Sequence, residues 1–295
     1  MTVKQLNQSI CLKEFISKKE YKEINELMDI CHLQDKTNLK LELEYKLNIT
    51  KNSEIGLTTI NEFLYYIDGV LVSYLGISSF GGNINEVNGM THPAWRRKGI
   101  FKKLFTLAIE QCSGKNINKL LLLTDGKSGS GIQFIKEVGG GYDFSEFRMK
   151  IQSKTAIDPI KSVNLRKANK LDGKEIGSQN AIYFDDLEDS ENYPEIEEIL
   201  NEITYMVELK GETIGKIKVD YSDKSSFIHA FGILPDFRGK GYGRAALKET
   251  LRLINGKNIY DVELDVECKN NAALNLYKAC GFEEKSIMNY YKLSL

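Results

Sequence analysis

The feature that most constrains this fold is a loop pattern that occurs twice in the chain. The segments Thr91–Phe101 and Ile233–Arg244 carry a proline, an arginine and a glycine at the same spacing, and the second set follows the first by 142 positions (235 − 93 = 142). The same offset aligns Gly281 with Gly139, so the register holds without a gap far beyond the loop. A repeat of this length indicates an internal duplication. The chain is therefore expected to contain two tandem domains of one fold.

The repeat also predicts the domain boundaries. The chain has 295 residues, which is enough for two domains of ordinary size. The offset aligns Leu293, near the end of the chain, with Ile151, so we expect the first domain to span 1–151. A linker at 152–161 is then expected to precede a second domain at 162–295.

Hydrophobic patterning predicts the elements of each domain. Two alternating runs meet at Asp68-Gly69 and another two at Lys210-Gly211, which predicts a hairpin in each copy. Helices are expected at four places, 12–31, 38–47, 98–112 and 245–254. Strands mixed with helices predict an α/β (α+β) fold. Each domain is expected to have a mixed, mostly antiparallel central sheet flanked by helices.

Composition and charge limit the functions that this chain can have. The formal net charge is −1 and no long basic block occurs, so nucleic acid is not expected as a partner. No apolar segment resembles a membrane span and the first residues lack a signal-peptide core, so we expect a cytoplasmic protein without a membrane partner. The five cysteines are scattered, with no paired spacing and no histidine cluster beside them, so neither disulfides nor a metal site are expected.

The second loop has the features of an anion-binding site. An apolar run at 227–234 is followed by a glycine-rich stretch and then by an amphipathic one, which predicts a strand, a loop and a helix. Unpaired N–H groups at the start of such a helix, with the positive end of its dipole, attract a phosphate. Glycines let the backbone approach, and Arg238, Lys240 and Arg244 add positive charge. The segment is interpreted as a diphosphate-binding loop.

Three kinds of phosphate-binding loop can be compared with this pattern. A P-loop ends in Gly-Lys-Ser/Thr, which is missing here, and the Rossmann pattern G-x-G-x-x-G does not fit the run from Gly239 to Ala246. The third pattern, Arg-x-x-Gly-x-Gly shortly after a proline that ends a strand, is met from Arg238 to Gly243. It resembles motif A of the GCN5-related N-acetyltransferase (GNAT) family. A plain glycine-rich turn with solvated basic residues is the alternative for the loop taken alone.

A second motif supports the same resemblance. A short strand, Leu264–Glu267, is followed by Asn270-Asn-Ala-Ala-Leu-Asn-Leu-Tyr-Lys-Ala-Cys-Gly-Phe282, which resembles motif B of the family, with Gly281 placed to end the helix. The resemblance implies the GNAT fold, with the fourth and fifth strands splayed, and acetyl-CoA (coenzyme A) as cofactor. The cofactor-binding residues that it implies are Ile233, Leu234, Pro235, Arg238, Gly239, Lys240, Gly241, Tyr242, Gly243, Arg244 and Asn270.

The resemblance also implies a chemistry. In this family an amine attacks the thioester directly, so a tyrosine on the helix after the fifth strand can protonate the leaving sulfur, and Tyr277 stands there. Backbone N–H groups near Ile233 would polarise the carbonyl. His229 is a candidate base because an imidazole titrates near neutral pH, with Glu267 or a water molecule as alternatives. Packing within the sheet is the structural alternative for Tyr277 and His229.

The first copy departs from the pattern at three positions. At the offset of 142, Gly243, Asn270 and Tyr277 are matched by Phe101, Ser128 and Ile135. Isoleucine cannot donate a proton, so the first domain is expected to be a diverged copy without the usual acid. Its loop remains basic. A second candidate cofactor site therefore comprises Thr91, Arg96, Arg97, Lys98, Gly99 and Ile100.

These features predict an enzyme. The second domain is expected to move the acetyl group of acetyl-CoA to a primary amine of a small molecule or peptide. An acidic run at 185–198 would favour a cationic acceptor, although a solvated loop and helix start is the simpler explanation. The alternative function is an acyl-CoA-binding sensor or scaffold without turnover, and Tyr277 favours the enzyme. Aminoacyl-tRNA, used by some two-domain relatives, is disfavoured by the near-neutral charge.

Overall fold

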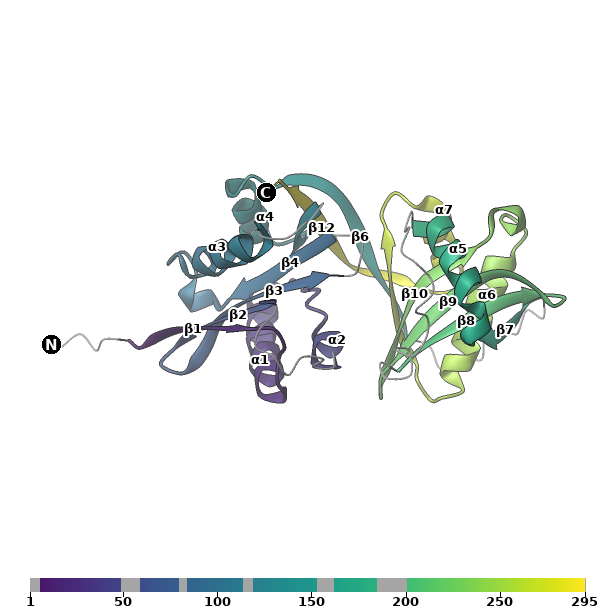
Figure 1. Cartoon of the computed structure of the whole chain (residues 1–295), viewed down its shortest axis with the longest axis horizontal. Helices are drawn as coiled ribbons and strands as arrows, with labels where there is room; N and C mark the ends of the chain where they lie inside the picture. Colours follow the sequence, from purple (N-terminus) through teal and green to yellow (C-terminus); the bar gives the residue numbers. More distant parts are fainter. Residues whose placement is uncertain are drawn as a thin grey trace. The chain divides into compact units, whose positions relative to one another are not determined.

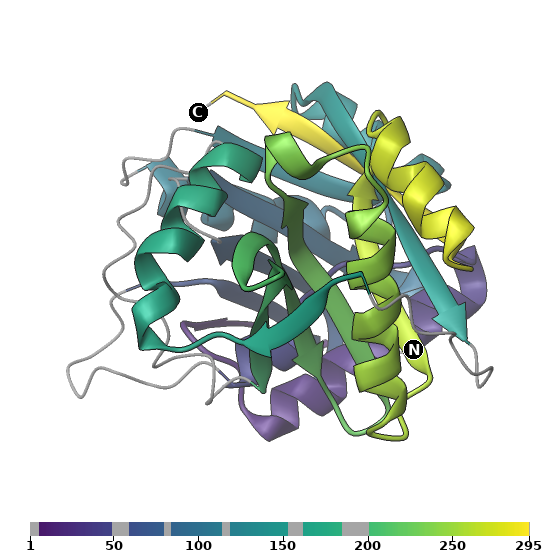
Figure 2. The same cartoon turned by 90° about the vertical axis from the view of Figure 1, so that its right-hand side faces the viewer.

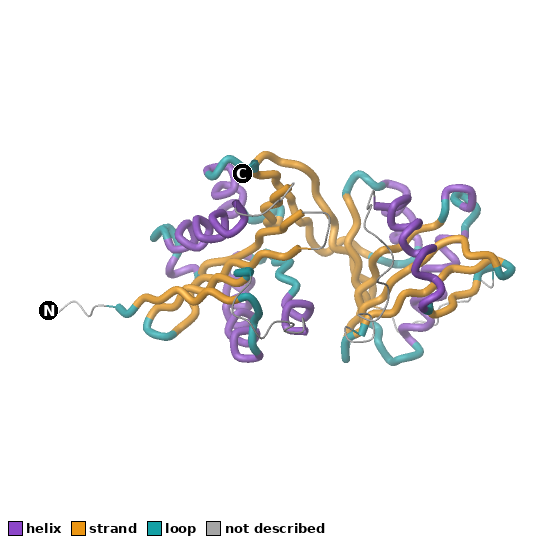
Figure 3. The backbone as a smooth tube through the Cα atoms, viewed as in Figure 1, coloured by secondary structure: helices purple, strands orange, loops and turns teal. Residues whose placement is uncertain are grey.

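The chain forms two compact units, which are described separately. The computed structural model describes residues 6–48, 59–79, 84–113, 119–152, 162–184 and 201–294. The first unit comprises Met1–Ser145 with Met288–Leu295, and the second comprises Glu146–Ile287. Both units contain strands and helices (Figure 3).

The first unit is built on a six-stranded sheet. Its strands lie in the order β1 (Gln8–Lys13), β2 (Glu62–Ile67), β3 (Val70–Ser79), β4 (Ile84–Thr91), β5 (Lys119–Asp125) and the last part of β12 (Glu283–Leu293). Neighbouring strands are antiparallel except for β4 and β5, which are parallel. The sheet is therefore mixed and mostly antiparallel, as expected.

Helices cover both faces of this sheet. Figure 1 shows α1 (Lys18–Asp35) and α2 (Leu43–Asn48) below the strands, and α3 (Ile100–Ser113) and α4 (Gly129–Glu137) above them. Each pair has its own apolar core, because successive side chains of a strand point to opposite faces. The helix expected at 12–31 is wrong at its start: Leu12 lies in β1 opposite Phe63. The helix begins after Ser17, whose side chain and that of Glu20 form a reciprocal capping box.

The second unit repeats this plan with one fewer helix among its described residues. Its strands lie in the order β6 (Gly141–Gln152), β11 (Asp261–Glu267), β10 (Ser225–Ile233), β9 (Glu212–Tyr221), β8 (Glu202–Leu209) and β7 (Asn164–Lys167). Its helices are α5 (Gly173–Phe184), α6 (Tyr242–Asn255) and α7 (Asn271–Ala279). Figure 2 shows α5 and α6 on opposite sides of the strands. The main apolar core lies between the sheet and α6 with α7.

Both hairpins turn where the sequence predicts. Asp68 and Lys210 have φ of 48° and 52°, and the glycines that follow them, Gly69 and Gly211, have φ of 81° and 88°. A pair of positive φ values is the mark of a two-residue turn that matches the twist of its strands. The α/β class with helix-flanked mixed sheets is confirmed in each unit.

The compact units differ from the contiguous domains that the repeat suggests. Residues 146–152, at the end of β6, pair with β11 in the second unit. Residues 288–293, at the end of β12, pair with β5 in the first unit. Each unit is thus completed by a strand from the other half of the sequence. The expected linker, 152–161, lies outside the described residues beyond Gln152, as does the acidic run at 185–198.

None of the helices in the described ranges has both the length and the apolar character that crossing a bilayer requires.

Candidate functional site

A gap opens between the two parallel strands of the second unit. Residues 225–228 of β10 pair with residues 261–264 of β11, and the pairing then stops although both strands continue. The separation begins after Ile228 and Leu264. It is the splay of the fourth and fifth strands that the family resemblance implies.

A bulge in β10 lies beside this gap. The register between β10 and β9 shifts between His229 and Gly232, and Ala230 has a φ of 45°. Such a bulge inserts one extra residue and turns its backbone groups out of the ladder. Beyond the bulge the N–H of Leu234 donates to the Ile214 carbonyl at 2.8 Å. Since bonded and non-bonded positions alternate along an antiparallel strand, the N–H of Ile233 faces away from β9, toward the gap.

The loop after β10 presents an open helix N-terminus. Residues 235–237 form a short 3₁₀ turn, and Arg238 donates from Nε to the Ile233 carbonyl at 2.7 Å. Gly239 and Gly241 have φ of 74° and 83°, a region that favours glycine. Gly241 is the N-cap of α6 and offers no side-chain bond to the first N–H groups. These amides remain available to an anion.

The basic residues of the loop are held by different partners. Lys240 donates to the Asp236 carbonyl at 2.8 Å and Arg244 to the Ala279 carbonyl at 3.1 Å. The guanidinium of Arg238 lies 5.9 Å from the centre of the Tyr183 ring. Among the described residues, the hydrogen bonds of the Arg238, Lys240 and Arg244 side chains go to backbone carbonyls and not to carboxylates. The positive charge of the loop is therefore not neutralised by a carboxylate of the described residues.

Gly243, in the first turn of α6, faces α7 and β10. A Cβ placed on Gly243 would lie 3.5 Å from Leu276 of α7 and 3.7 Å from Ile233 of β10, which are ordinary contact distances. A methyl group therefore fits, whereas a larger side chain has to enter the space between α6, α7 and β10.

Helix α7 carries the two motif B residues. Asn270 caps the helix, because its Oδ1 accepts from the Ala273 N–H at 3.1 Å, which leaves its amide NH₂ to donate elsewhere. Tyr277 is buried, with 8% of its surface exposed, and packs edge-on against Phe282. Burial, with a smaller effect of Cys280, raises the pKa of Tyr277 to about 12, so the phenol stays protonated at neutral pH.

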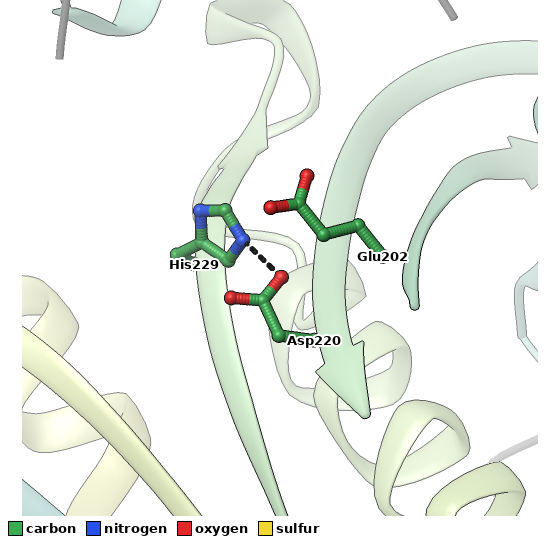
Figure 4. Close-up of side chains that lie close together, drawn as sticks. All are labelled: Glu202, Asp220 and His229. Carbon is green, nitrogen blue, oxygen red and sulfur yellow. Dashed lines mark hydrogen bonds and ion pairs between the residues drawn. The ribbon is translucent and has the colours of Figure 1, made fainter. Parts of the chain in front are cut away.

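His229 is part of a charged cluster that spans three strands. Its Nε2 lies 2.8 Å from Oδ1 of Asp220, and Figure 4 shows this contact with Glu202 beside it. One ligand-type atom from each of these three residues lies within 4.8 Å of the other two. Lys218 donates to Glu202 at 2.9 Å. Glu267, the other candidate base, is exposed at the end of β11, opposite Glu146 of β6.

The sequence analysis did not single out Asp220, Glu202 or Lys218. The register of β8, β9 and β10 brings them together, with Glu202 opposite Asp220 and Lys218 opposite His229. No linear motif links these positions. The one local signal is the hairpin turn at Lys210-Gly211, which sets the pairing of β8 with β9 near the turn. A register shift between Val207 and Glu208 then moves the rest of this pairing by one residue.

The first unit builds the same loop backbone. The parallel pairing of β4 with β5 ends after Val87 and Leu122, and the N–H of His92 donates to the Val72 carbonyl at 2.8 Å. Arg96 donates from Nε to the Thr91 carbonyl at 2.9 Å, as Arg238 does to Ile233. A 3₁₀ turn, residues 93–95, and a glycine with a φ of 76°, Gly99, complete the likeness. However, β4 pairs with β3 from Thr91 to Asn85 without a register shift, so this unit has no bulge there.

The ligand side of the first loop is occupied by the protein itself. Arg96 forms a two-bond ion pair with Asp35 at 2.9 and 2.6 Å, and this pair raises the pKa of the guanidinium. The ring of Phe101 meets that of Phe134 edge-on at 5.0 Å. It also lies so close to β4 that a Cβ on Gly89 would be 2.8 Å from it. At the position of Phe101 the second unit has Gly243, where a Cβ would lie 3.9 Å from the ring of Phe231, the counterpart of Gly89.

The remaining residues of the second candidate cofactor site have structural contacts. The hydroxyl of Thr91 lies 2.8 Å from that of Ser73, and Lys98 stacks 4.3 Å from the centre of the Trp95 ring. Ile100 is buried in the core. Arg97 adopts a φ of 60° where the second loop has Gly239. Ser128 caps α4 as Asn270 caps α7, whereas Ile135 is packed into the core.

Comparison with known proteins agrees with this geometry. Residues 175–282 match the model of the acetyltransferase (GNAT) family. N-alpha-acetyltransferase RimI of Mycobacterium tuberculosis is 37% identical over 68 residues, which cover 23% of this chain and 41% of that relative. The match therefore spans about two fifths of that relative's length.

Two solved structures share the fold over nearly the whole chain. A GCN5-related N-acetyltransferase from Sphaerobacter thermophilus has a TM-score of 0.77 at 16% identity, covering 97% of this chain and 95% of that one. A tandem GNAT protein from the clavulanic acid biosynthesis pathway has a TM-score of 0.70 at 13% identity, covering 97% and 98%. At these identities the likeness concerns the fold alone. Residues 175–282 are thus a domain of the acetyltransferase (GNAT) family, in a chain with the fold of tandem GNAT proteins.

Proposed function

We propose that the second unit transfers the acetyl group of acetyl-CoA to a primary amine of a small molecule or peptide. The observation that carries this proposal is the uncapped N-terminus of α6, which opens beside the gap between β10 and β11. The diphosphate of the donor binds the amides at Gly241 and the basic loop around it. The pantetheine arm enters the gap, where the N–H of Ile233 and the amide of Asn270 can bind it.

The bulge of β10 supports a place for the thioester. The gap extends from Ile233 back to Ile228, five residues or roughly 16 Å of extended strand. The bulge lies within this length, and its outward backbone groups offer donors for the thioester carbonyl. Tyr277, a buried phenol that is protonated at neutral pH, is the proposed acid for the leaving sulfur.

In this proposal the first unit has a structural role and no catalytic one. Its arginine is paired with Asp35 and its groove is filled by Phe101, so we infer that it binds no acetyl-CoA. The likeness of the curated relative, an N-alpha-acetyltransferase, supports an amine as the acceptor but does not identify it.

Calorimetric titration with acetyl-CoA tests the donor site through a matched pair of variants. Gly241 and Gly99 both have positive φ, 83° and 76°, and a Cβ on either would meet nothing within 4 Å. Gly241→Glu and Gly99→Glu therefore carry the same backbone strain and the same added charge. We expect one site in the unmodified chain, lost in Gly241→Glu and retained in Gly99→Glu. Two sites, or loss in Gly99→Glu alone, would contradict the proposed roles of the units.

Release of free thiol from acetyl-CoA in the presence of primary amines then distinguishes an enzyme from a sensor. We expect thiol release that depends on the amine, with an acetylated product of matching mass. Tight binding of acetyl-CoA without release for a broad set of polyamines, aminoglycosides and peptides would instead favour the acyl-CoA sensor.

A further inference from the structure

The side chain of His229 lies at the closed end of the gap in the second unit. Ile228, the last residue of β10 paired with β11, belongs to the core under α6 and α7. Because successive side chains of a strand alternate, the side chain of His229 lies on the opposite face. It is also the first residue at the bulge. An arm that enters at the loop and runs along the gap therefore brings its thioester toward His229.

The hydrogen bond to Asp220 sets which ring nitrogen of His229 can accept a proton. A neutral imidazole has one N–H donor and one acceptor nitrogen, and a carboxylate can only accept from the donor. Since Nε2 lies 2.8 Å from Oδ1 of Asp220, the neutral ring carries its proton on Nε2 and its lone pair on Nδ1. We propose that Asp220 is a positioning residue that holds His229 as the base for the acceptor amine. This inference rests on the proposed acetyl transfer.

The cluster is specific to the unit with the open loop. At the offset of 142, the first unit has Ile60 for Glu202, Gly76 for Lys218 and Ser78 for Asp220. The residue opposite Gly76 is Asn88, whose side chain donates to the Lys40 carbonyl. None of these four first-unit residues can form a carboxylate–imidazole pair. The pair therefore occurs together with the bulge and the uncapped helix start, which a merely structural tie does not require.

Other charges around His229 are already balanced. Glu202 is neutralised by Lys218 at 2.9 Å, and Arg148 of β6 binds Glu263 and Asp265 of β11. A divalent cation would find three ligand atoms within 4.8 Å of one another, but it would have to compete with Lys218 for Glu202. The cluster thus fits proton transfer better than metal binding.

The proton balance of the reaction is complete with these groups. Nδ1 of His229 takes one proton from the ammonium form of the acceptor and passes it to water. The free amine attacks the thioester carbonyl, so that a C–N bond forms and the C–S bond breaks. The leaving sulfur takes a proton from Tyr277. The nitrogen gives up its second proton at this step, and that proton restores the tyrosine.

Nitrogen NMR of the imidazole tests the positioning role without any acceptor. The chain has three histidines, so a His229→Gln variant assigns the signals. We expect the Nε2–H form in the unmodified chain, and a mixture of both neutral forms in Asp220→Ala. Glu202→Gln is the matched control, because it removes a neighbouring carboxylate that does not bond to the ring. The same ring state in Asp220→Ala as in the unmodified chain would overturn the inference.

Acetylation of two amines of equal length, propylamine and 3,3,3-trifluoropropylamine, separates positioning from structure. Fluorine lowers the basicity of the second amine, so more of it is already neutral and it needs the base less. We expect Asp220→Ala to lower kcat/KM for propylamine at least tenfold more than for its fluorinated analogue. Equal losses would mean a structural role only. Zn²⁺ binding that shifts the His229 signals at micromolar concentration would favour a metal site instead and overturn the inference.

Failure of the inference and failure of the proposed function give different results. If neither amine is acetylated and no acetyl-CoA binds, the proposed function fails, while the NMR comparison still decides whether Asp220 orients His229. If acetyl-CoA binds and the amines react at equal rates in all variants, the function stands and the base assignment is wrong.

Discussion

The two loops of this chain have nearly the same backbone and very different surroundings. In each, the residue after the strand donates to the neighbouring strand at 2.8 Å, and the arginine Nε donates to a strand carbonyl, Thr91 or Ile233. The guanidinium of Arg96 is then paired with Asp35, whereas that of Arg238 lies over an aromatic ring. The ring of Phe101 packs against β4, whereas Gly243 places no side chain at the matching position. Local backbone bonds thus preserve a loop after duplication, while a few side chains decide whether it can bind.

The strand before the loop differs as well. In the first unit β4 pairs regularly with β3, whereas β10 has a bulge at His229–Gly232. The bulge frees backbone donors on the side of the gap, which a regular strand keeps in its ladder. The acetyl transfer proposed for the second unit therefore relies on a local irregularity as well as on the proposed acid and base.

The largest expected difference between the units concerns their two helix residues at the offset of 142, Tyr277 and Ile135. Tyr277→Phe removes the proposed acid and should lower kcat by about 10²- to 10⁴-fold, with little change in acetyl-CoA affinity. Ile135→Val, in the first unit, should leave kcat unchanged and cost about 1 kcal/mol of stability. Steady-state kinetics and calorimetry on both variants measure this contrast. Lost affinity with normal kcat in Tyr277→Phe would mean that the ring only shapes the groove.

The next prediction concerns the face of the first unit's sheet that lies opposite α3 and α4, and it separates the stability of the first unit from binding in the second. In the first unit Lys46, Glu62 and Tyr74 form a buried polar cluster, with Lys46 2.9 Å from Glu62. Lys46→Ala leaves the Glu62 carboxyl without its cation, and should cost about 3–5 kcal/mol in the free energy of unfolding. The acetyl-CoA affinity of the second unit should stay unchanged. Denaturant unfolding and calorimetry together measure both. A loss of binding with intact stability would show that the units depend on each other for binding.

The same cluster predicts a pH dependence. Burial raises the pKa of Glu62 above 4.5, and Lys46 and Tyr74 only partly offset it. A carboxyl whose pKa is higher in the folded state stabilises the fold at low pH, and this contribution is lost as the pH rises through the folded pKa. Without Lys46 the folded pKa rises further. The unfolding free energy of Lys46→Ala, relative to the unmodified chain, should therefore decrease as the pH rises above 4.5.

A reciprocal substitution tests whether Phe101 accounts for the closed groove. Gly243→Phe copies the first unit into the second and should weaken acetyl-CoA binding by about 10²-fold, or about 2.7 kcal/mol. Gly243→Ala is the control, because a Cβ there meets only contacts of 3.5 Å or more. Calorimetry measures both affinities. Unchanged binding in Gly243→Phe would mean that the groove can rearrange around the ring.

The smallest predicted effect concerns backbone strain in the two loops. Arg97 has a φ of 60° and its counterpart Gly239 has a φ of 74°. Arg97→Gly should raise stability by a few tenths of a kcal/mol, roughly, because relief of strain outweighs the entropy of the unfolded glycine. Gly239→Ala should lower it by about 1 kcal/mol. Thermal unfolding of both variants measures the signs, and the same sign in both would contradict the shared loop geometry.

Local patterns in the sequence are sufficient to predict the loops, the hairpins and the helix end at Gly281. Gly241 needs its positive φ whatever surrounds it, and Asp68-Gly69 forms a turn by itself. The register between strands, in contrast, cannot be predicted from such local patterns. Asp220 reaches His229 through the register of β9 with β10, and Glu202 joins them only after a register shift in β8, and no pattern in the sequence reports these registers. The start of the first helix was missed because Leu12 is apolar and in helical phase, although it pairs in β1.

The exchange of the ends of β6 and β12 between the two units could not be predicted from the sequence either. The ends of β6 and β12 are counterparts in the repeat, so their patterns suit either sheet. Only the packing of the whole chain decides that residues 146–152 join β11 and residues 288–293 join β5.

This exchange has a consequence for the order in which the protein can be made. Strand β5 of the first unit is buried along almost its whole length, and its partner, residues 288–293, is translated after nearly everything else. Until residues 288–293 are synthesised, this edge of β5 lacks the partner strand that it has in the folded chain. The second unit, in contrast, receives residues 146–152 before the rest of its sheet is synthesised. The unit encoded first is thus the one completed last.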